Sequence, residues 1–329
     1  MGSREPDVSR IGHCRNAMLF TLLLLSVSPA GDSLAAPRTA HLLFKSGFEA
    51  KVTLRSVSGG YSQYQRIQGV DSSTNFQWPI MLWKPHPDLT GLQEVVTSDN
   101  GNPAPEDNTA YIQNTIETIT GPAGTPTRAL KMGVIKDSPR TCCIQDNLQI
   151  AGISEEITDV YIRFWLKLNP GFPEQLREYK NAFWRTVWET KTKSDYRIAA
   201  YIYGDAAGRP YWYVQADNNT GAGSSYRQYW AISNHSVPVP ATQWLSVELY
   251  LHRSTGSDGR FYWGVNGQTI ADHSGSNYGS NYEKINLLMF SNVYGLGRPA
   301  YQWIDDLEVW DLPPCALLPC GASGDASGN

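Results

Sequence analysis

Alternation of apolar and polar residues dominates the chain from residue 129 onward. Ten segments there alternate or run apolar over strand length, and turn sequences such as Asn169-Pro170-Gly171 separate them. The segments are residues 129–135, 159–168, 182–192, 197–203, 211–216, 228–232, 244–252, 260–265, 285–291 and 303–310. A period of two is typical of half-buried β-strands. A helix is predicted only over Pro173–Lys180. The pattern therefore predicts an all-β sandwich or jelly roll.

The rest of the chain is less regular. Residues 56–128 are rich in Ser, Gly, Asn, Pro and Thr, so we expect long loops with short strands, including residues 80–83 and 110–119. No repeat or linker divides residues 36–312, which predicts one jelly-roll domain. Residues 313–329 are predicted to form a flexible tail that contains cysteines.

The N-terminal segment has the pattern of an export signal. Three arginines precede the apolar run Ala17–Val27, and small residues follow at Ser33 and Ala35. This order predicts a signal peptide over residues 1–35, because the run is too short to cross a bilayer. A membrane anchor is the other interpretation. We expect a secreted or periplasmic protein with no membrane span after removal of the signal.

Export changes the interpretation of the cysteines. Four remain after the predicted signal: Cys142, Cys143, Cys315 and Cys320. In an oxidising compartment an even number indicates disulfides. Either Cys315 and Cys320 close a terminal loop, or two long-range bridges join the tail to the region of Cys142. Zinc is the competing interpretation, but no histidine lies at ligand spacing near either pair.

Composition and charge exclude some classes of binding partner. The 329 residues are 12% aromatic and 18% charged, with a formal net charge of −4. That balance lacks the basic character of a nucleic-acid-binding domain. The chain also lacks a Gly-rich phosphate loop and a Ser–His–Asp motif. We expect a monomer with no nucleic-acid partner and no organic cofactor.

Four segments carry a family resemblance. They are Phe44–Glu49, Trp244–Gln268, Trp303–Trp310 and Tyr161–Phe172. The first three resemble, in order, the opening strand, the back-sheet hairpin and the closing strand of the concanavalin A-like jelly-roll superfamily. The fourth is similar to a strand of its lyase-like members. The resemblance implies a jelly-roll sandwich of two antiparallel sheets. The catalytic strings R-T-E-x-R and Q-I-H of alginate lyases are missing.

Two reactions of the superfamily make different demands on the residues. Related glucanases use E-x-D-x-x-E, but Glu189 has no acidic partner two residues later. A polysaccharide lyase must instead neutralise a uronate carboxylate and abstract the C5 proton. We predict Arg197, Tyr201 and Tyr213 as its catalytic residues.

Alternation predicts one polar sheet face that carries Arg185, Glu189, Arg197, Tyr201 and Tyr213. Sugar rings stack on aromatic faces, while Arg and Gln bind hydroxyls. The predicted substrate-binding residues are Arg185, Trp188, Glu189, Tyr203, Gln215 and His235. The alternative is an ordinary solvated face with cross-strand ion pairs.

The best prediction of function is β-elimination on a uronate-containing glycan. The alternative is a non-catalytic carbohydrate-binding or surface-adhesion module. In calcium-binding members of the superfamily the opening and closing strands hold the ion at the sheet edge. This resemblance implies a structural calcium held by Glu49 and Asp305. Alternatively, Asp305 caps its strand by accepting backbone N–H bonds.

Overall fold

The computed structural model describes most of the chain after residue 38. The described ranges are residues 39–57, 63–80, 82, 93–99, 112–136, 144–179, 184–218, 225–295 and 299–314. The predicted signal peptide and all the cysteines lie outside these ranges, as does the tail from residue 315. Within them, no helix is long and apolar enough to span a membrane.

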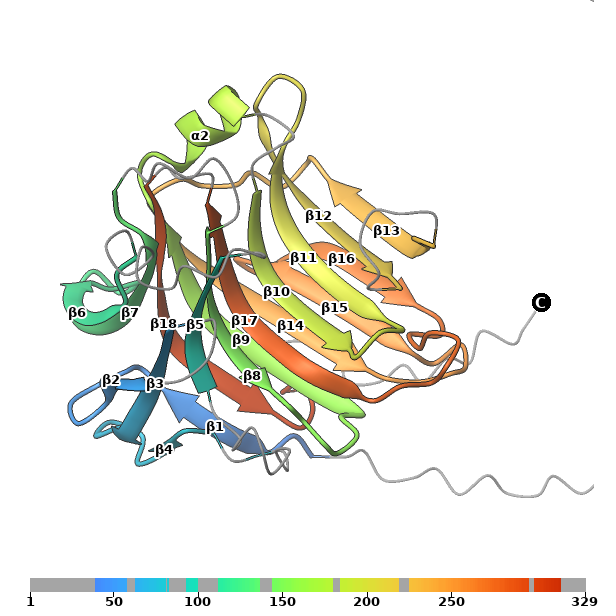
Figure 1. The fold of residues 1–329 in the computed structure, drawn as a ribbon, viewed down its shortest axis with the longest axis horizontal. Coiled ribbons are helices and arrows are strands. Elements are labelled where there is room, and N and C mark those ends of the chain that lie inside the picture. The colour runs from blue at the N-terminus through green and yellow to red at the C-terminus, as the bar shows by residue number, and fades with distance from the viewer. Residues whose placement is uncertain are drawn as a thin grey trace, which may run out of the picture. The chain divides into compact units, whose positions relative to one another are not determined.

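The described strands form two antiparallel sheets (Figure 1). The eight-stranded sheet has the order β16-β15-β14-β9-β18-β7-β6, with β1 beside β18. Its strands are β1 (Leu42–Ser46), β6 (Thr115–Thr120), β7 (Pro126–Val134), β9 (Asp159–Leu168), β14 (Trp244–His252), β15 (Arg260–Val265), β16 (Gln268–Ser274) and β18 (Ala300–Trp310).

The ten-stranded sheet has the order β13-β12-β11-β10-β17-β8-β5-β3-β2, with β4 beside β3. Its strands are β2 (Thr53–Val57), β3 (Gln63–Val70), β4 (Gln77–Trp78), β5 (Gln93–Asp99), β8 (Ile144–Ala151), β10 (Trp184–Thr192), β11 (Arg197–Gly204), β12 (Pro210–Asp217), β13 (Gln228–Asn234) and β17 (Ile285–Gly295). The short helix α2 (Phe172–Tyr179) confirms the predicted helix to within one residue at each end.

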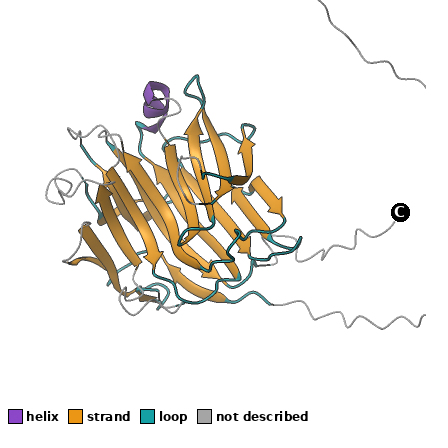
Figure 2. Cartoon of the chain, turned by 45° about the vertical axis from the view of Figure 1, so that its right-hand side comes forward, coloured by secondary structure: helices purple, strands orange, loops and turns teal. Residues whose placement is uncertain are grey.

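The two sheets lie face to face and bury the core between them (Figure 2). Trp188 of β10 stacks on Phe261 of β15 at 5.6 Å between ring centroids. Trp212 of β12 contacts Trp263, also of β15, edge-on, with 5.4 Å between ring centroids. Large aromatic residues therefore fill the interior, as is usual in a wide sandwich. Alternate residues of the same strands point away from the core.

The region between residues 56 and 128 is more regular than its composition suggests. It contains β3 and β5, for which no strand was predicted, so the prediction of long loops is wrong for these two segments. β6 overlaps the strand predicted at residues 110–119. Pairing on both sides stabilises β3 and β5 within the larger sheet. The strand expected at residues 80–83 is not formed at Ile80, which lies just after β4. Strand pairing, rather than an apolar pattern, forms this part of the sandwich.

The chain ends of the sandwich meet at β18. β9 lies along one side of β18, and on the other side β7 pairs with Ala300–Ile304 while β1 pairs with Leu307–Trp310. Between these two segments the register shifts, and Asp306 adopts a positive φ of 48°. Asp305 and Asp306 therefore lie where one neighbouring strand ends and the other begins.

Candidate functional site

The candidate site lies on the outer face of the ten-stranded sheet, which points away from the eight-stranded sheet. In the register of β11 and β12, Arg197 faces Asp217 and Tyr201 faces Tyr213. The intervening residues Ile198, Ala200 and Ile202 are buried in the core. The predicted catalytic residues Arg197, Tyr201 and Tyr213 therefore share one face, as the alternation indicated. Tyr201 is nevertheless only 6% exposed, because neighbouring side chains on that face cover it.

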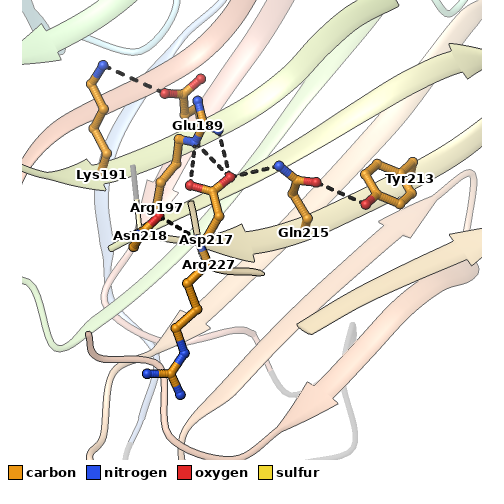
Figure 3. Close-up of polar contacts among 8 residues, drawn as sticks. All are labelled: Glu189, Lys191, Arg197, Tyr213, Gln215, Asp217, Asn218 and Arg227. Atoms are coloured by element: carbon orange, nitrogen blue, oxygen red, sulfur yellow. Dashed lines mark hydrogen bonds and ion pairs between the residues drawn. The ribbon is translucent and has the colours of Figure 1, made fainter. Parts of the chain in front are cut away.

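A polar network crosses two strands of this face (Figure 3). Arg197 donates through Nε and Nη2 to the carboxylate of Asp217, with Nη2 2.6 Å from Oδ2. Gln215 Nε2 donates to the same Oδ2 at 2.7 Å, and its Oε1 accepts from Tyr213 Oη at 2.9 Å. Burial alone lowers the pKa of Arg197, but its bonds with Asp217 outweigh this and raise that pKa. Arg197 is therefore a permanently charged and firmly held group.

Glu189 lies beside this network on β10. Its side chain is 9% exposed, and Oε1 is 3.9 Å from Lys191 Nζ. Burial raises the pKa of Glu189, and the nearby charges of Lys191 and Arg197 offset that effect only in part. A carboxyl group with a raised pKa is a better proton acceptor once it is ionised than an ordinary surface carboxylate.

An aromatic cluster continues the outer face from the polar network. Tyr201 and Tyr203 have ring centroids 5.3 Å apart, and Tyr203 lies 5.3 Å from Tyr213 edge-on. Tyr211 extends the cluster and stacks on exposed His235 at 4.4 Å. Trp184 of β10 adds a further ring, with its centroid 5.9 Å from that of Tyr203. These rings form a platform of the kind on which sugar rings stack.

The tyrosines of the platform stay neutral near pH 7. Burial raises the pKa of Tyr201 well above its ordinary value, and the nearby Glu189 adds to this effect. Burial also raises the pKa of Tyr203 to about 12 and the pKa of Tyr213 above its usual value. Their hydroxyl groups therefore act as hydrogen-bond and proton donors rather than as ready bases.

Two predicted residues do not reach the outer face. A β-bulge between Thr186 and Trp188 reverses the alternation of β10, so Thr186 faces Tyr201 and Arg185 points inward. Arg185 is fully buried, donates to Asn169 at 2.6 Å, and has its pKa lowered by burial to about 9. The prediction of a shared face is wrong for Arg185. Trp188 is buried in the core against Phe261, which corrects its placement at a substrate-binding surface.

The other predicted binding residues are brought together. Glu189, Tyr203 and Gln215 lie on the outer face, and His235 borders it. Sequence reasoning missed Asp217, which ends β12 one residue beyond the predicted strand, and Trp184, which the bulge turns outward. The spacing of Gln215 and Asp217 by two residues was the available signal for Asp217. No local signal marked the bulge.

The residues predicted to hold calcium lie near each other at the break beside β18. Thr127 Oγ1 is 3.3 Å from Glu49 Oε1 and 3.0 Å from Asp305 Oδ2. Asp305 Oδ1 also accepts the N–H of Asp306 at 2.8 Å, as the capping alternative expects. Burial, followed by the charge of Asp306, raises the pKa of Asp305 to about 7. The oxygen donors suit a hard cation in kind. However, no group of three or more His, Cys, Asp or Glu residues in the described ranges could hold a metal. Calcium stays a prediction.

Comparison with known proteins gives only distant structural likenesses. No protein-family model matches the sequence, and no curated protein is significantly similar to it. The alginate lyase Aly36B is 16% identical with a TM-score of 0.40, covering 60% of this chain and 82% of that one. The endo-β-1,4-glucuronan lyase of the fungus Trichoderma reesei is 12% identical with a TM-score of 0.42, covering 60% and 89%. The binding domain of botulinum neurotoxin serotype G is 13% identical with a TM-score of 0.34, covering 61% and 43%.

The fold assignment depends on the sheets themselves. Both sheets are antiparallel throughout the described register, the opening strand β1 pairs with the closing strand β18, and β14 and β15 form the hairpin that the sequence resemblance located. The chain is an all-β sandwich of two antiparallel sheets.

Proposed function

We propose that the outer face of the ten-stranded sheet binds a polysaccharide, and that the best-supported reaction is β-elimination on a uronate-containing chain. The observation that carries the proposal is the aromatic platform directly beside the network of Arg197, Asp217 and Gln215. Apolar ring faces and charge-assisted donors on one rigid sheet are what a sugar chain with acidic groups requires. Strands hold these groups more firmly than loops would.

The network supplies the binding chemistry for an acidic sugar. Asp217 uses Nε and Nη2 of Arg197, so Nη1 remains outside this ion pair. Lys191 adds a second cation at the edge of the same face. A uronate carboxylate placed between these cations would be partly neutralised, which acidifies its C5 proton. The neighbouring tyrosine rings would hold the adjacent sugar units.

β-Elimination needs a proton acceptor and a proton donor. The C5–H bond breaks as the acceptor takes the proton, the C4–C5 double bond forms, and the C4–O bond breaks with protonation of the leaving oxygen. Neutral Tyr201 and Tyr213 suit the donor, because their raised pKa values keep the protons on the hydroxyls. Glu189 and His235 are the titratable groups beside the platform that suit the acceptor.

A panel of uronate polysaccharides tests the reaction. Elimination creates an unsaturated product, so we expect the ultraviolet absorbance of that product to rise with at least one of the polymers. The matched control is Arg260→Gln, which removes a cation paired with Asp272 on the eight-stranded sheet. It should leave the rate unchanged, whereas Arg197→Gln should lower the rate at least 100-fold. A flat absorbance trace with every polymer would refute the lyase.

A non-catalytic binding module is the second candidate. The observation that favours it is the bidentate pairing of Arg197 with Asp217, which leaves less of its charge for a reacting carboxylate. Affinity electrophoresis in gels that contain the same polymers separates the two functions. Retardation without any unsaturated product would support the module, and the absence of both would refute polysaccharide binding at this face.

A further inference from the structure

The outer face of the eight-stranded sheet carries a second row of aromatic and basic residues. Register places Lys131 opposite Trp303, Trp303 opposite Lys167, and Lys167 opposite Trp244, across β7, β18, β9 and β14. Neighbouring positions on these strands, such as Leu130 and Ile304, are buried in the core, so the row faces away from it. We call these four residues and Tyr301 the lysine–tryptophan row.

The row alternates cations and rings. Lys167 Nζ lies 5.8 Å from the ring centroid of Trp244 and 5.6 Å from that of Trp303. Lys131 Nζ lies 4.9 Å from the centroid of Tyr301 and 5.6 Å from that of Trp303. Trp303 forms the floor with 8% exposure, while Trp244 and Tyr301 are half-buried. Each end of the row therefore presents part of an aromatic ring beside an ammonium group.

Hydrogen bonds to the region of β6 fix both indole rings. Trp303 Nε1 donates to Glu117 Oε1 at 2.8 Å, and Trp244 Nε1 donates to the backbone carbonyl oxygen of Thr120 at 2.8 Å. Because both indole N–H groups are satisfied, the rings are held in one orientation without a ligand. A preoriented ring loses little conformational entropy on binding.

The charges of the row are incompletely balanced. Lys131 has Glu117 at 3.9 Å, but Lys167 has no carboxylate within ion-pair distance among the described residues. Its ammonium group lies over the rings of Trp244 and Trp303. An anionic group of a ligand would complement that charge.

A cavity adjoins the row on the same face. It has a volume of about 340 Å³ and is lined by the turn between β6 and β7, by Trp165, and by Asp305 and Asp306. Trp165 precedes Lys167 by two residues on β9, so both point to the same side of the sheet. The partly exposed carboxyl group of Asp306 would accept hydrogen bonds from sugar hydroxyls, while Trp165 offers a ring. The volume is within the usual range of small-ligand sites.

We propose that the lysine–tryptophan row and this cavity form a second polysaccharide-binding site, for a chain that carries carboxylate groups. Trp244 and Trp303 are two strands apart, which is about 10 Å and roughly the length of two sugar units in an extended chain. One carboxylate of the polymer pairs with Lys167, and sugar rings lie against Trp244 and Tyr301. This site does not depend on the activity proposed for the ten-stranded sheet.

Affinity electrophoresis with alginate tests the second site through Lys167→Met, which removes the charge and keeps an aliphatic stem. We expect alginate binding to weaken about three- to ten-fold. Lys284→Met, at an exposed lysine outside both faces, is the matched control and should bind as the unmodified protein does. Trp244→Phe, which keeps a ring but loses the bond to Thr120, should give a smaller loss. An unchanged thermal midpoint in Lys167→Met shows that the loss is not unfolding.

Combining variants separates this site from the site on the ten-stranded sheet. Tyr211→Ala should weaken binding at the aromatic platform, and adding Lys167→Met should weaken the remaining retardation further. If Lys167→Met binds alginate like Lys284→Met, the row is only cross-strand packing and the second site does not exist. If Lys167→Met instead loses affinity for vesicles of anionic phospholipid and keeps its affinity for alginate, the polysaccharide proposal is wrong. If Lys167→Met weakens alginate binding and Tyr211→Ala does not, the result would support this site and refute the site on the ten-stranded sheet.

Discussion

At the residue scale, burial decides how each charged group of the sandwich behaves. Asp146 is fully buried, and although Asn114 Nδ2 and the backbone of Gly133 bond to its carboxyl group, burial raises its pKa to about 8. Asp71 is also buried, but the hydroxyls of Ser46 and Ser73 and two backbone N–H groups bond to its carboxylate. Burial raises the pKa of Asp71, yet these bonds outweigh it and the pKa is lowered. The two carboxyl groups therefore differ in pKa because of their hydrogen-bond partners rather than because of their depth of burial.

The two aspartates predict opposite pH dependences. Folded Asp146 keeps its proton up to about pH 8, while unfolded Asp146 loses it near pH 4, so wild-type stability falls as pH rises between these values. Asp146→Asn should not show this fall, and at pH 8 it should be more stable than wild type by a few kcal/mol. Urea unfolding at pH 5 and pH 8 measures the difference. A variant that loses stability at both pH values would contradict the assignment.

Asp71→Asn is the matched comparison. Its carboxylate is stabilised in the folded state, so its contribution is present above the unfolded pKa and is lost as pH falls through the folded value. We expect Asp71→Asn to be destabilised at pH 7 by about 1–3 kcal/mol and to approach wild type at low pH. The same urea series detects this.

The ion pair of the candidate site gives a second prediction at this scale. Asp217 is fully buried and Arg197 is its bidentate partner, so Arg197→Ala leaves a buried carboxylate without its cation. The free energy of unfolding should fall by about 3–5 kcal/mol. The double variant Arg197→Ala with Asp217→Asn should recover part of that loss, because the unpaired charge is gone. No recovery in thermal unfolding would mean that the pair is not coupled.

At the element scale, alternation predicts where strands are but not where they are interrupted. All ten apolar segments after residue 129 overlap strands, because a half-buried strand must alternate. The side on which Arg185 points could not be predicted, since the bulge before Trp188 is a property of pairing with β11. The prediction that Arg197 and Tyr201 share a face is correct, because β11 pairs with β12 without a shift in register. The site was predictable on regular strands only.

Replacing either of two glycines with positive φ tests how closely the strands pack. A Cβ atom added at Gly133 of β7 would lie 2.3 Å from the carbonyl oxygen of Ala300 in β18, whereas one at Gly124 would meet nothing within 4 Å. Both Ala variants incur strain from positive φ, so only Gly133→Ala also forces two strands apart. We expect Gly124→Ala to cost about 1 kcal/mol and Gly133→Ala to cost clearly more. Equal midpoints in thermal unfolding would contradict this.

At the scale of the whole molecule, the first and last strands of the sandwich lie side by side. Glu49 follows β1, Asp305 lies in β18, and Thr127 lies between their carboxylates. A calcium ion bound there would link three distant segments and stabilise the folded state by mass action. We expect the thermal midpoint to rise with millimolar calcium and to fall with a chelator, and Asp305→Asn to remove both effects. Identical midpoints with calcium and with chelator would refute the calcium site.

The pairing of β1 with β18 has a consequence for the order of the chain. Leu42 lies opposite Trp310, and beyond them His41 N–H donates to Asp311 Oδ1 at 2.7 Å. A short Gly-Ser linker from residue 314 to residue 39 should therefore close the polypeptide into a ring without strain. New ends opened at the exposed turn Asn266–Gly267 should give a circular permutant with the native near-ultraviolet circular dichroism spectrum. By the same geometry, the sandwich should fold as a guest within a surface loop of another protein, entering and leaving at one point.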